Sequence, residues 1–242
     1  MDLSSFEQHI LGGGVDLSAL PAAAPIKTRE ERHLAWLQSR RGKFTASEFH
    51  RVMAYPDKNQ LPKGGMTYAL EKAVEAVADI DETDKFVSID MQWGIDHELE
   101  AIELFTQRTG LSVDSTGERQ QLLTKGDDMG CTPDGLIGND SGIEIKCPKS
   151  KTHFEYSLLN STEDLKECMP NYYWQIQGSL YITGRKNWHF VSYDPRFNAF
   201  QHKLKLLYIK RNEADIALLA DRLALAIAYR NHLLALFGQV NT

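Results

Sequence analysis

The sequence predicts an α/β fold in which helices flank a mixed central sheet. Apolar residues recur at helical spacing in the segment that ends at Gly110, where Ile95, Leu99, Ile102 and Phe105 would share one face. Runs rich in aromatic and β-branched residues, such as WHFVSY and FQHKLKLLYI, indicate strands instead. Helical and strand patterns therefore interleave along the chain, as they do in α/β domains.

Residues 1–29 differ in composition from the rest of the chain. They contain GGG and PAAAP, which are typical of a poorly packed arm, and their role is unassigned. Residues 30–242 are expected to form one domain around a single core. The expected elements are, in chain order, a helix over 30–41, a helix over 45–52 opened by the capping-box pattern TASE, a loop over 55–66, a helix over 67–78, the helix ending at Gly110, two or three short strands between 111 and 147, a helix from Pro170, the two strands named above and a long helix over 213–237.

Composition limits the classes of protein to consider. No stretch of eighteen apolar residues is free of charge, and the first ten residues lack the basic and apolar regions of a signal peptide, so neither a membrane span nor export is expected. The three cysteines, Cys131, Cys147 and Cys168, have no CxxC spacing, which argues against a zinc cage or a disulfide framework. Cys131 and Cys147 are expected to be buried fillers. We therefore expect a cytoplasmic protein.

The net charge of −6 argues against a general nucleic-acid coat, because phosphate binding usually needs surplus lysine and arginine. The charge is uneven, however. Residues 71–144 contain eighteen acids and five bases, whereas residues 185–211 contain seven bases and one acid. This division suits either a nuclease with an acidic metal site and a basic segment, or two ordinary solvated faces.

The most informative stretch is PDGLIGNDSGIEIKCP, from Pro133 to Pro148. Its GNDSG segment is strong turn chemistry between two strand-like runs, which predicts a hairpin. On the second strand Glu144 and Lys146 would share one face, while the isoleucines between them would face the core. With a turn centred near Asp140, Asp134 would lie across from Lys146 and diagonal to Glu144. Two carboxylates and an ammonium would then converge.

Such a group of side chains suits phosphodiester hydrolysis. Magnesium prefers carboxylate oxygens and water as ligands, and it lowers the pKa of a bound water. A nearby lysine can orient that water, or deprotonate it if the pKa of the lysine is depressed. The alternative interpretation is a surface Glu/Lys pair beside a turn aspartate.

This pattern resembles the PD-(D/E)xK nuclease signature, with Pro133-Asp134 and Glu144-Ile145-Lys146 as its two halves. Four ordered blocks also resemble the lambda exonuclease or YqaJ-type viral recombinase family: RRGKFTASEFHRVMA, WGIDHELEAIELF, CTPDGLIGNDSGIEIKCP and YYWQIQGSLYITGRKNWHFVSYDPR. They span Arg40 to Arg196, about two thirds of the chain. The resemblance implies a restriction-endonuclease-like PD-(D/E)xK core.

The resemblance implies a role for each matched residue. Asp134 and Glu144 match metal carboxylates, the Ile145 carbonyl would be a further ligand, and Lys146 matches the catalytic lysine. Glu98 matches a helix carboxylate that reaches the metal site, although a solvated helix charge is the default interpretation of such a residue. His97 and His153 are expected to be exposed or to lie outside the ligand shell, because magnesium sites favour oxygen.

A second matched group concerns the end of the DNA. Four residues match positions that hold a terminal 5′-phosphate: Arg40, Ser47, Thr132 and Gln175. Gln177 lies on roughly the opposite helix face and is not expected to take part. Met91 matches an apolar side chain that separates the strands at the duplex end, and a core methionine is the alternative. Thr45 and Ser47 could also simply cap a helix while Arg40 forms a surface ion pair.

By this resemblance, the chain is expected to be a Mg²⁺-dependent 5′-to-3′ exonuclease, with Mn²⁺ as a substitute cation. It would digest one strand of linear double-stranded DNA and leave 3′ overhangs for phage-type recombination in a bacterial host cell. A homotrimeric ring and a single-strand annealing protein are the expected assembly and partner. The rival functions are another PD-(D/E)xK nuclease, such as an endonuclease or junction resolvase, and a non-catalytic DNA-end-binding protein.

Overall fold

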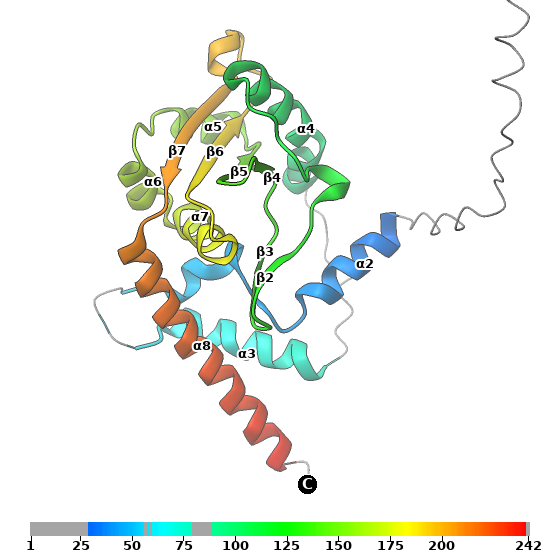
Figure 1. The fold of residues 1–242 in the computed structure, drawn as a ribbon, viewed down its shortest axis with the longest axis vertical. Coiled ribbons are helices and arrows are strands. Elements are labelled where there is room, and N and C mark those ends of the chain that lie inside the picture. Colours follow the sequence, from blue (N-terminus) through cyan, green and yellow to red (C-terminus); the bar gives the residue numbers. More distant parts are fainter. Residues whose placement is uncertain (1–28, 56–57, 59, 79–88, 241–242) are drawn as a thin grey trace, which may run out of the picture. The chain divides into compact units, whose positions relative to one another are not determined.

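A four-stranded mixed sheet carries the predicted hairpin (Figure 1). Its strand order is β4 (Gly135–Ile137), β5 (Ser141–Lys146), β6 (Asn187–Tyr193) and β7 (Leu204–Lys210). Strands β4 and β5 are antiparallel, β5 and β6 are parallel, and β6 and β7 are antiparallel. The predicted mixed sheet is therefore confirmed. In a computed structural model of the chain, the described residues are 29–55, 58, 60–78 and 89–240, and those from Leu34 onward belong to one unit.

The remaining elements connect and cover this sheet. A smaller sheet has the order β1 (Phe44–Thr45), β3 (Met129–Cys131) and β2 (Leu123–Lys125). The helices are α2 (Arg29–Arg40), α3 (Lys63–Val77), α4 (Ile89–Thr109), α5 (Ser150–Ser157), α6 (Thr162–Cys168), α7 (Pro170–Thr183) and α8 (Glu213–Val240), with short 3₁₀ helices η2 (Ala46–Val52), η4 (Gly117–Arg119) and η5 (Phe200–His202). Helices α5, α6 and α7 form the crossover that the parallel pair β5–β6 requires. No helix among the described residues is long and apolar enough to span a membrane.

Strand β5 is buried on both of its faces. Ile143 and Ile145 pack in a cluster with Ala101 and Phe105 of α4. Glu144 is paired in register with Phe190. Phe190 belongs to a second buried cluster, which also contains residues of α7 and α8. Because side chains alternate along a strand, Glu144 faces the α7 side while its isoleucine neighbours face α4. A carboxylate is thus held inside the fold.

Two close contacts fix where the hairpin and α7 lie. The Arg185 guanidinium donates to the Gly138 carbonyl at 2.8 Å and to the Ser141 carbonyl at 2.6 Å, so the turn is fastened to the end of α7. A Cβ on Gly178 would lie 2.4 Å from the Phe49 ring, which shows that α7 approaches η2 too closely for any larger residue. The hairpin, α7 and η2 are therefore brought together by packing as well as by chain connection.

Several expectations about the elements are wrong in detail. The turn is centred at Asn139, since Ile137 pairs with Ser141, so Asp134 lies level with Glu144 and not with Lys146. Helix α3 begins at Lys63 instead of residue 67, and four strands, not two or three, lie between 111 and 147. Helices α5 and α6 had no counterpart in the prediction. The arm expected at 1–29 lies outside the described residues except for Arg29, the first residue of α2.

The predicted capping box at Thr45 is also wrong. The segment that follows is a 3₁₀ helix, and the Thr45 side chain makes no capping hydrogen bond. The backbone N–H of Thr45, which Glu48 was expected to satisfy, donates instead to the buried Tyr68 hydroxyl at 2.7 Å. Glu48 pairs with Arg51 at 3.5 Å. A tertiary contact has therefore replaced the local one.

Candidate active site

The hairpin brings the first three predicted site residues together. A carboxylate oxygen of Asp134 accepts the backbone N–H of Ile145 at 2.7 Å. Glu144 Oε1 accepts from Lys146 Nζ at 2.5 Å and from Gln175 Nε2 at 2.6 Å. Only 1% of the Glu144 surface is exposed, so this carboxylate depends on those two donors in place of water.

The predicted helix carboxylate reaches the same place through a residue that the sequence did not single out. Gln120 Nε2 donates to Glu98 Oε1 at 2.8 Å and lies 3.4 Å from the Asp134 carbonyl. Gln120 thus links α4 to the hairpin. It follows η4 in an irregular segment without periodicity, so no sequence pattern could have identified it.

Negative charge is in excess in this group. Burial raises the pKa of Asp134 well above its ordinary value, and the Glu144 charge raises it further, against the lowering effect of Lys146. The pKa of Glu98 is raised by burial and then by Glu144. Three carboxylates face a single ammonium, and a bound cation would relieve their repulsion.

The charge state of Lys146 corrects one expectation. Burial alone would lower its pKa, but the Glu144 and Asp134 charges outweigh burial and raise it above the ordinary value for lysine. In this arrangement Lys146 stays protonated. It is therefore suited to donating hydrogen bonds and stabilising negative charge, and not to abstracting a proton from water.

Gln120, Asp134, Glu144 and Lys146 open onto a cavity of about 240 Å³, and Glu98 is not part of its lining. Its lining comprises Trp36, Arg40, Thr45, Ala46, Ser47, Gln120, Cys131, Thr132, Asp134, Glu144, Lys146, Gln175 and Ser179. All four residues predicted to hold a phosphate are in this lining, beside the carboxylates and the lysine. The sequence did not indicate the other lining residues as site residues: Trp36, Thr45, Ala46, Gln120, Cys131 and Ser179.

Arg40 adds a positive charge to the lining of the same cavity. Its Nη1 donates to the Thr132 hydroxyl at 3.2 Å, and its guanidinium stacks on Trp36 at 4.3 Å from the ring centroid. Burial lowers the pKa of Arg40, but an arginine remains charged in proteins. A charged guanidinium next to a hydroxyl suits an anionic group of the ligand.

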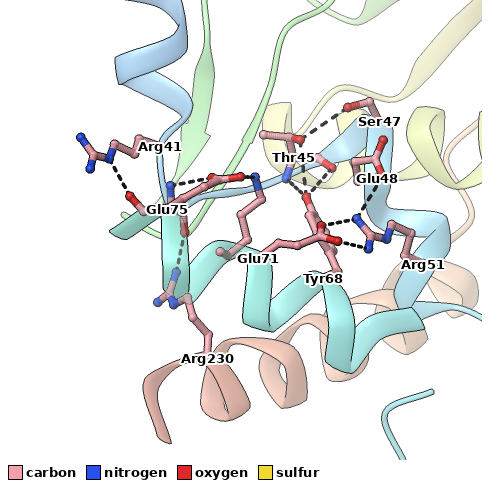
Figure 2. A network of polar contacts seen from close by, with 11 residues as sticks. Arg41, Thr45, Ser47, Glu48, Arg51, Tyr68, Glu71, Glu75 and Arg230 are labelled. Atoms are coloured by element: carbon pink, nitrogen blue, oxygen red, sulfur yellow. Dashed lines mark hydrogen bonds and ion pairs between the residues drawn. The ribbon is translucent and has the colours of Figure 1, made fainter. Parts of the chain in front are cut away.

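Polar contacts with α3 hold the segment that carries Arg40 and Ser47 (Figure 2). The neighbouring Arg41 turns toward α3 and donates to the Glu75 carbonyl at 2.6 Å. The Thr45 hydroxyl lies 3.4 Å from the Ser47 hydroxyl and 3.5 Å from the Tyr68 hydroxyl. Two hydroxyls of the cavity are thereby linked to a buried tyrosine of α3.

Other predicted residues lie elsewhere or have other contacts. Met91 is 58% exposed near the start of α4, so the core-methionine interpretation is wrong. Gln175 contacts Glu144, and Gln177 is buried, donating to the Lys210 carbonyl. Of the two expectations for His153, exposure is wrong, because the side chain is fully buried and hydrogen-bonded to Ser192 and to the His202 carbonyl, with no contact to the hairpin carboxylates among these bonds. Cys131 and Cys147 are buried, as expected.

The donor chemistry of the site fits a hard divalent cation. Asp134, Glu144 and Glu98 offer carboxylate oxygens, and burial, followed by the Glu144 charge, raises the pKa of both Asp134 and Glu98. Among the described residues, no three His, Cys, Asp or Glu side chains are already gathered closely enough to hold a metal. Each carboxylate is instead paired with a donor of the protein.

Residues 35–186, which include Glu98 and the whole lining of the cavity, match the YqaJ-like viral recombinase domain. That is more than half of the chain. The chain belongs to this family. The resemblance seen in the four sequence blocks is therefore confirmed.

The solved structures similar to this YqaJ-like domain include those of two exonucleases. The alkaline exonuclease LHK-Exo from Laribacter hongkongensis is 27% identical, with a TM-score of 0.71 over 86% of this chain and 97% of that one. Its complex with dAMP gives a TM-score of 0.72 over the same shares. A phage-related exonuclease from Haemophilus somnus is 15% identical, with a TM-score of 0.62 over 81% and 96%, and supports the fold. No curated protein sequence matches the chain significantly.

The charge excess predicts an unusual effect of pH on stability. A carboxyl whose pKa is higher in the folded chain than the ordinary value near 4 keeps its proton over a window in which the unfolded chain has lost it, so stability falls as pH rises through that window. Asp134→Asn removes the charge but keeps an acceptor for the Ile145 N–H. We expect this substitution to raise the unfolding midpoint of the metal-free protein at pH 7, by about 2–4 °C for each kcal/mol gained in the free energy of unfolding.

The measurement is thermal unfolding in a chelating buffer between pH 4 and pH 8. Asp140→Asn is the matched control, because Asp140 lies in the turn of the same hairpin and pairs with Lys186 at the exposed surface. It should leave the pH dependence unchanged. A lower midpoint for Asp134→Asn than for the unmodified chain at pH 7 would contradict the charge excess.

Proposed function

We propose that this YqaJ-like domain is a Mg²⁺-dependent exonuclease that digests one strand of linear double-stranded DNA from its 5′ end. The observation that carries the proposal is one cavity whose lining contains Asp134, Glu144 and Lys146 together with Arg40 and Thr132. Hydrolytic groups and an anion-binding group are thus within reach of one terminal nucleotide. The similar LHK-Exo, an alkaline exonuclease solved with dAMP, supports the same activity here.

The carboxylates are the ligands that a divalent cation would use. Asp134, Glu144 and the Ile145 carbonyl would hold Mg²⁺, with Glu98 as a further carboxylate and Mn²⁺ as a substitute. When bound, such a cation lowers the pKa of a water and stabilises charge on the phosphate. The excess of negative charge in the site is the physical reason for expecting tight cation binding.

The protein groups have separate tasks. Lys146, whose pKa the Glu144 and Asp134 charges raise in the metal-free site, would donate to a phosphate oxygen and stabilise the charge that develops there. Gln175 keeps one lone pair of Glu144 engaged and so orients that carboxylate. Gln120 does the same for Glu98.

The direction of digestion would follow from the phosphate-binding residues of the cavity. A terminal 5′-phosphate held by Arg40 and by the hydroxyls of Thr132 and Ser47 places the first phosphodiester bond at the carboxylates. The guanidinium and the hydroxyls would hold the phosphate without an α-helix N-terminus, because the segment that follows Thr45 is a short 3₁₀ helix. Gln175, which contacts Glu144, would serve the carboxylates more than the phosphate.

The biological setting remains a proposal from the family. We propose that the product is a 3′ overhang used in phage-type recombination by strand annealing, with a single-strand annealing protein as partner. A homotrimeric ring would let an acidic protein stay on DNA, because only its inner surface need be basic. Met91, exposed at the start of α4, would separate the strands at the duplex end.

Charge-removing variants of the hairpin test the hydrolytic assignment. Glu144→Gln and Lys146→Met should each lower kcat on linear duplex DNA by about 100-fold or more, the scale of losing a group that stabilises transition-state charge. Asp140→Asn is the control and should keep full activity. Closed circular duplex should resist the unmodified protein, whereas an endonuclease or a resolvase would cut it, and Mg²⁺-dependent activity retained by Glu144→Gln would refute the assignment.

Adjacent arginines test the phosphate assignment. Arg40→Ala should reduce the preference for a 5′-phosphate over a 5′-hydroxyl by about 1.5–3 kcal/mol, the value of a hydrogen bond to a charged group. Arg41→Ala is the matched control, since Arg41 turns toward α3 and should keep the preference. The measurement is the ratio of digestion rates on the two kinds of duplex. Equal rates for the unmodified protein would exclude a 5′-phosphate site even if it is a nuclease.

A further inference from the structure

Helix α7 contacts both members of the Glu144–Lys146 pair on β5. Gln175 donates to the Glu144 carboxylate, and one turn earlier the ring centroid of Tyr172 lies 5.1 Å from Lys146 Nζ. Residues three apart share a helix face, so α7 presents the ring and the amide to the same strand. An ammonium at this distance from a tyrosine ring is within the range of a cation–π interaction.

The Tyr172 ring is itself held in place by a buried aromatic cluster. Its hydroxyl accepts from the Tyr156 hydroxyl at 3.4 Å, and the two rings meet edge to face at 6.0 Å. The Phe190 ring, which is fully buried, lies 5.7 Å from that of Tyr172. The ring therefore cannot move without disturbing the core of the sheet.

Lys146 needs such an anchor because its other contacts are with the Glu144 and Asp134 carboxylates, which are also the proposed ligands of the cation. Its ammonium ends a flexible four-carbon chain and is bonded to Glu144 at 2.5 Å, with Asp134 nearby. If Glu144 turned toward a cation, a lysine bound only to that carboxylate would lose its position. The Tyr172 ring is fixed independently of both carboxylates.

We infer that Tyr172 is a positioning residue for Lys146, and that the face of its ring, not its hydroxyl, holds the ammonium at the carboxylates. The placement stands on the contacts above. Its consequence for catalysis rests on the proposed nuclease function.

Nuclear magnetic resonance tests the placement directly. The protein is labelled with [ε-¹³C]lysine, and the Lys146 signal is assigned by its loss in Lys146→Arg. A methylene over an aromatic face is shifted upfield, so the Lys146 signal should lie upfield in the unmodified protein and in Tyr172→Phe, which keeps the ring. Tyr172→Leu and Tyr172→Met should move it to the position of an ordinary lysine. Two replacements are used so that one misfolded variant, recognised by its circular dichroism, does not decide the result.

Digestion kinetics test the consequence. The variants that lack the ring should lower kcat roughly 3- to 30-fold, the range that corresponds to a cation–π contact. Their KM for DNA should change by less than about twofold, because Lys146 acts in the reaction more than in binding. Tyr172→Phe should restore kcat. A merely structural role of Tyr172 would not separate kcat from KM in this way.

The two arms separate failure of this inference from failure of the proposed function. A Lys146 signal that is not shifted upfield in the unmodified protein, or is unchanged in the folded Leu and Met variants, overturns the inference whether or not the protein is a nuclease. A loss of kcat in Tyr172→Phe equal to that in the Leu variant overturns the role of the ring face. If the unmodified protein digests no DNA, the proposed function fails, and the resonance arm alone decides the placement.

Discussion

The burial of the Glu144 carboxylate is the constraint on which the rest of the site depends. Strand β5 is covered on both faces, and a charge in such a place is costly unless hydrogen-bond donors replace the lost water. Lys146 supplies one donor from the same strand, and Gln175 supplies another from α7. The position of α7 against β5 is therefore a requirement of the charge as much as of the apolar core.

The same constraint connects stability with function. The site holds three carboxylates and one ammonium, and burial together with the Glu144 charge raises the pKa of Asp134 and of Glu98. Such a site lowers the stability of the fold when no cation is bound, and cation binding restores that stability. Lys146 is kept charged by the same carboxylates, so its role follows from their presence.

The sequence predicted the parts of the site that depend on local pattern. Alternation along β5 placed Glu144 and Lys146 on one face, and the turn residues placed the hairpin to within one residue. It could not predict contacts between distant segments. The Tyr68 hydroxyl, 23 residues away, accepts the hydrogen bond from the Thr45 N–H for which the capping pattern predicted Glu48 as the acceptor. A loop was predicted over 55–66, which includes the glycines at the start of α3. A Cβ on Gly65 would lie 2.7 Å from Leu61, so close packing explains why glycine occupies this helical position.

The activity that we propose for this cavity is hydrolysis of DNA from a 5′ end with the help of a divalent cation. The most direct measurement is digestion of linear duplexes that carry a label at either the 5′ or the 3′ end of one strand, with Mg²⁺ and with a chelator. The proposed activity predicts early release of the 5′ label as mononucleotide, late release of the 3′ label, and no release in the chelator. Early release of the 3′ label, or equal digestion with and without Mg²⁺, would contradict it.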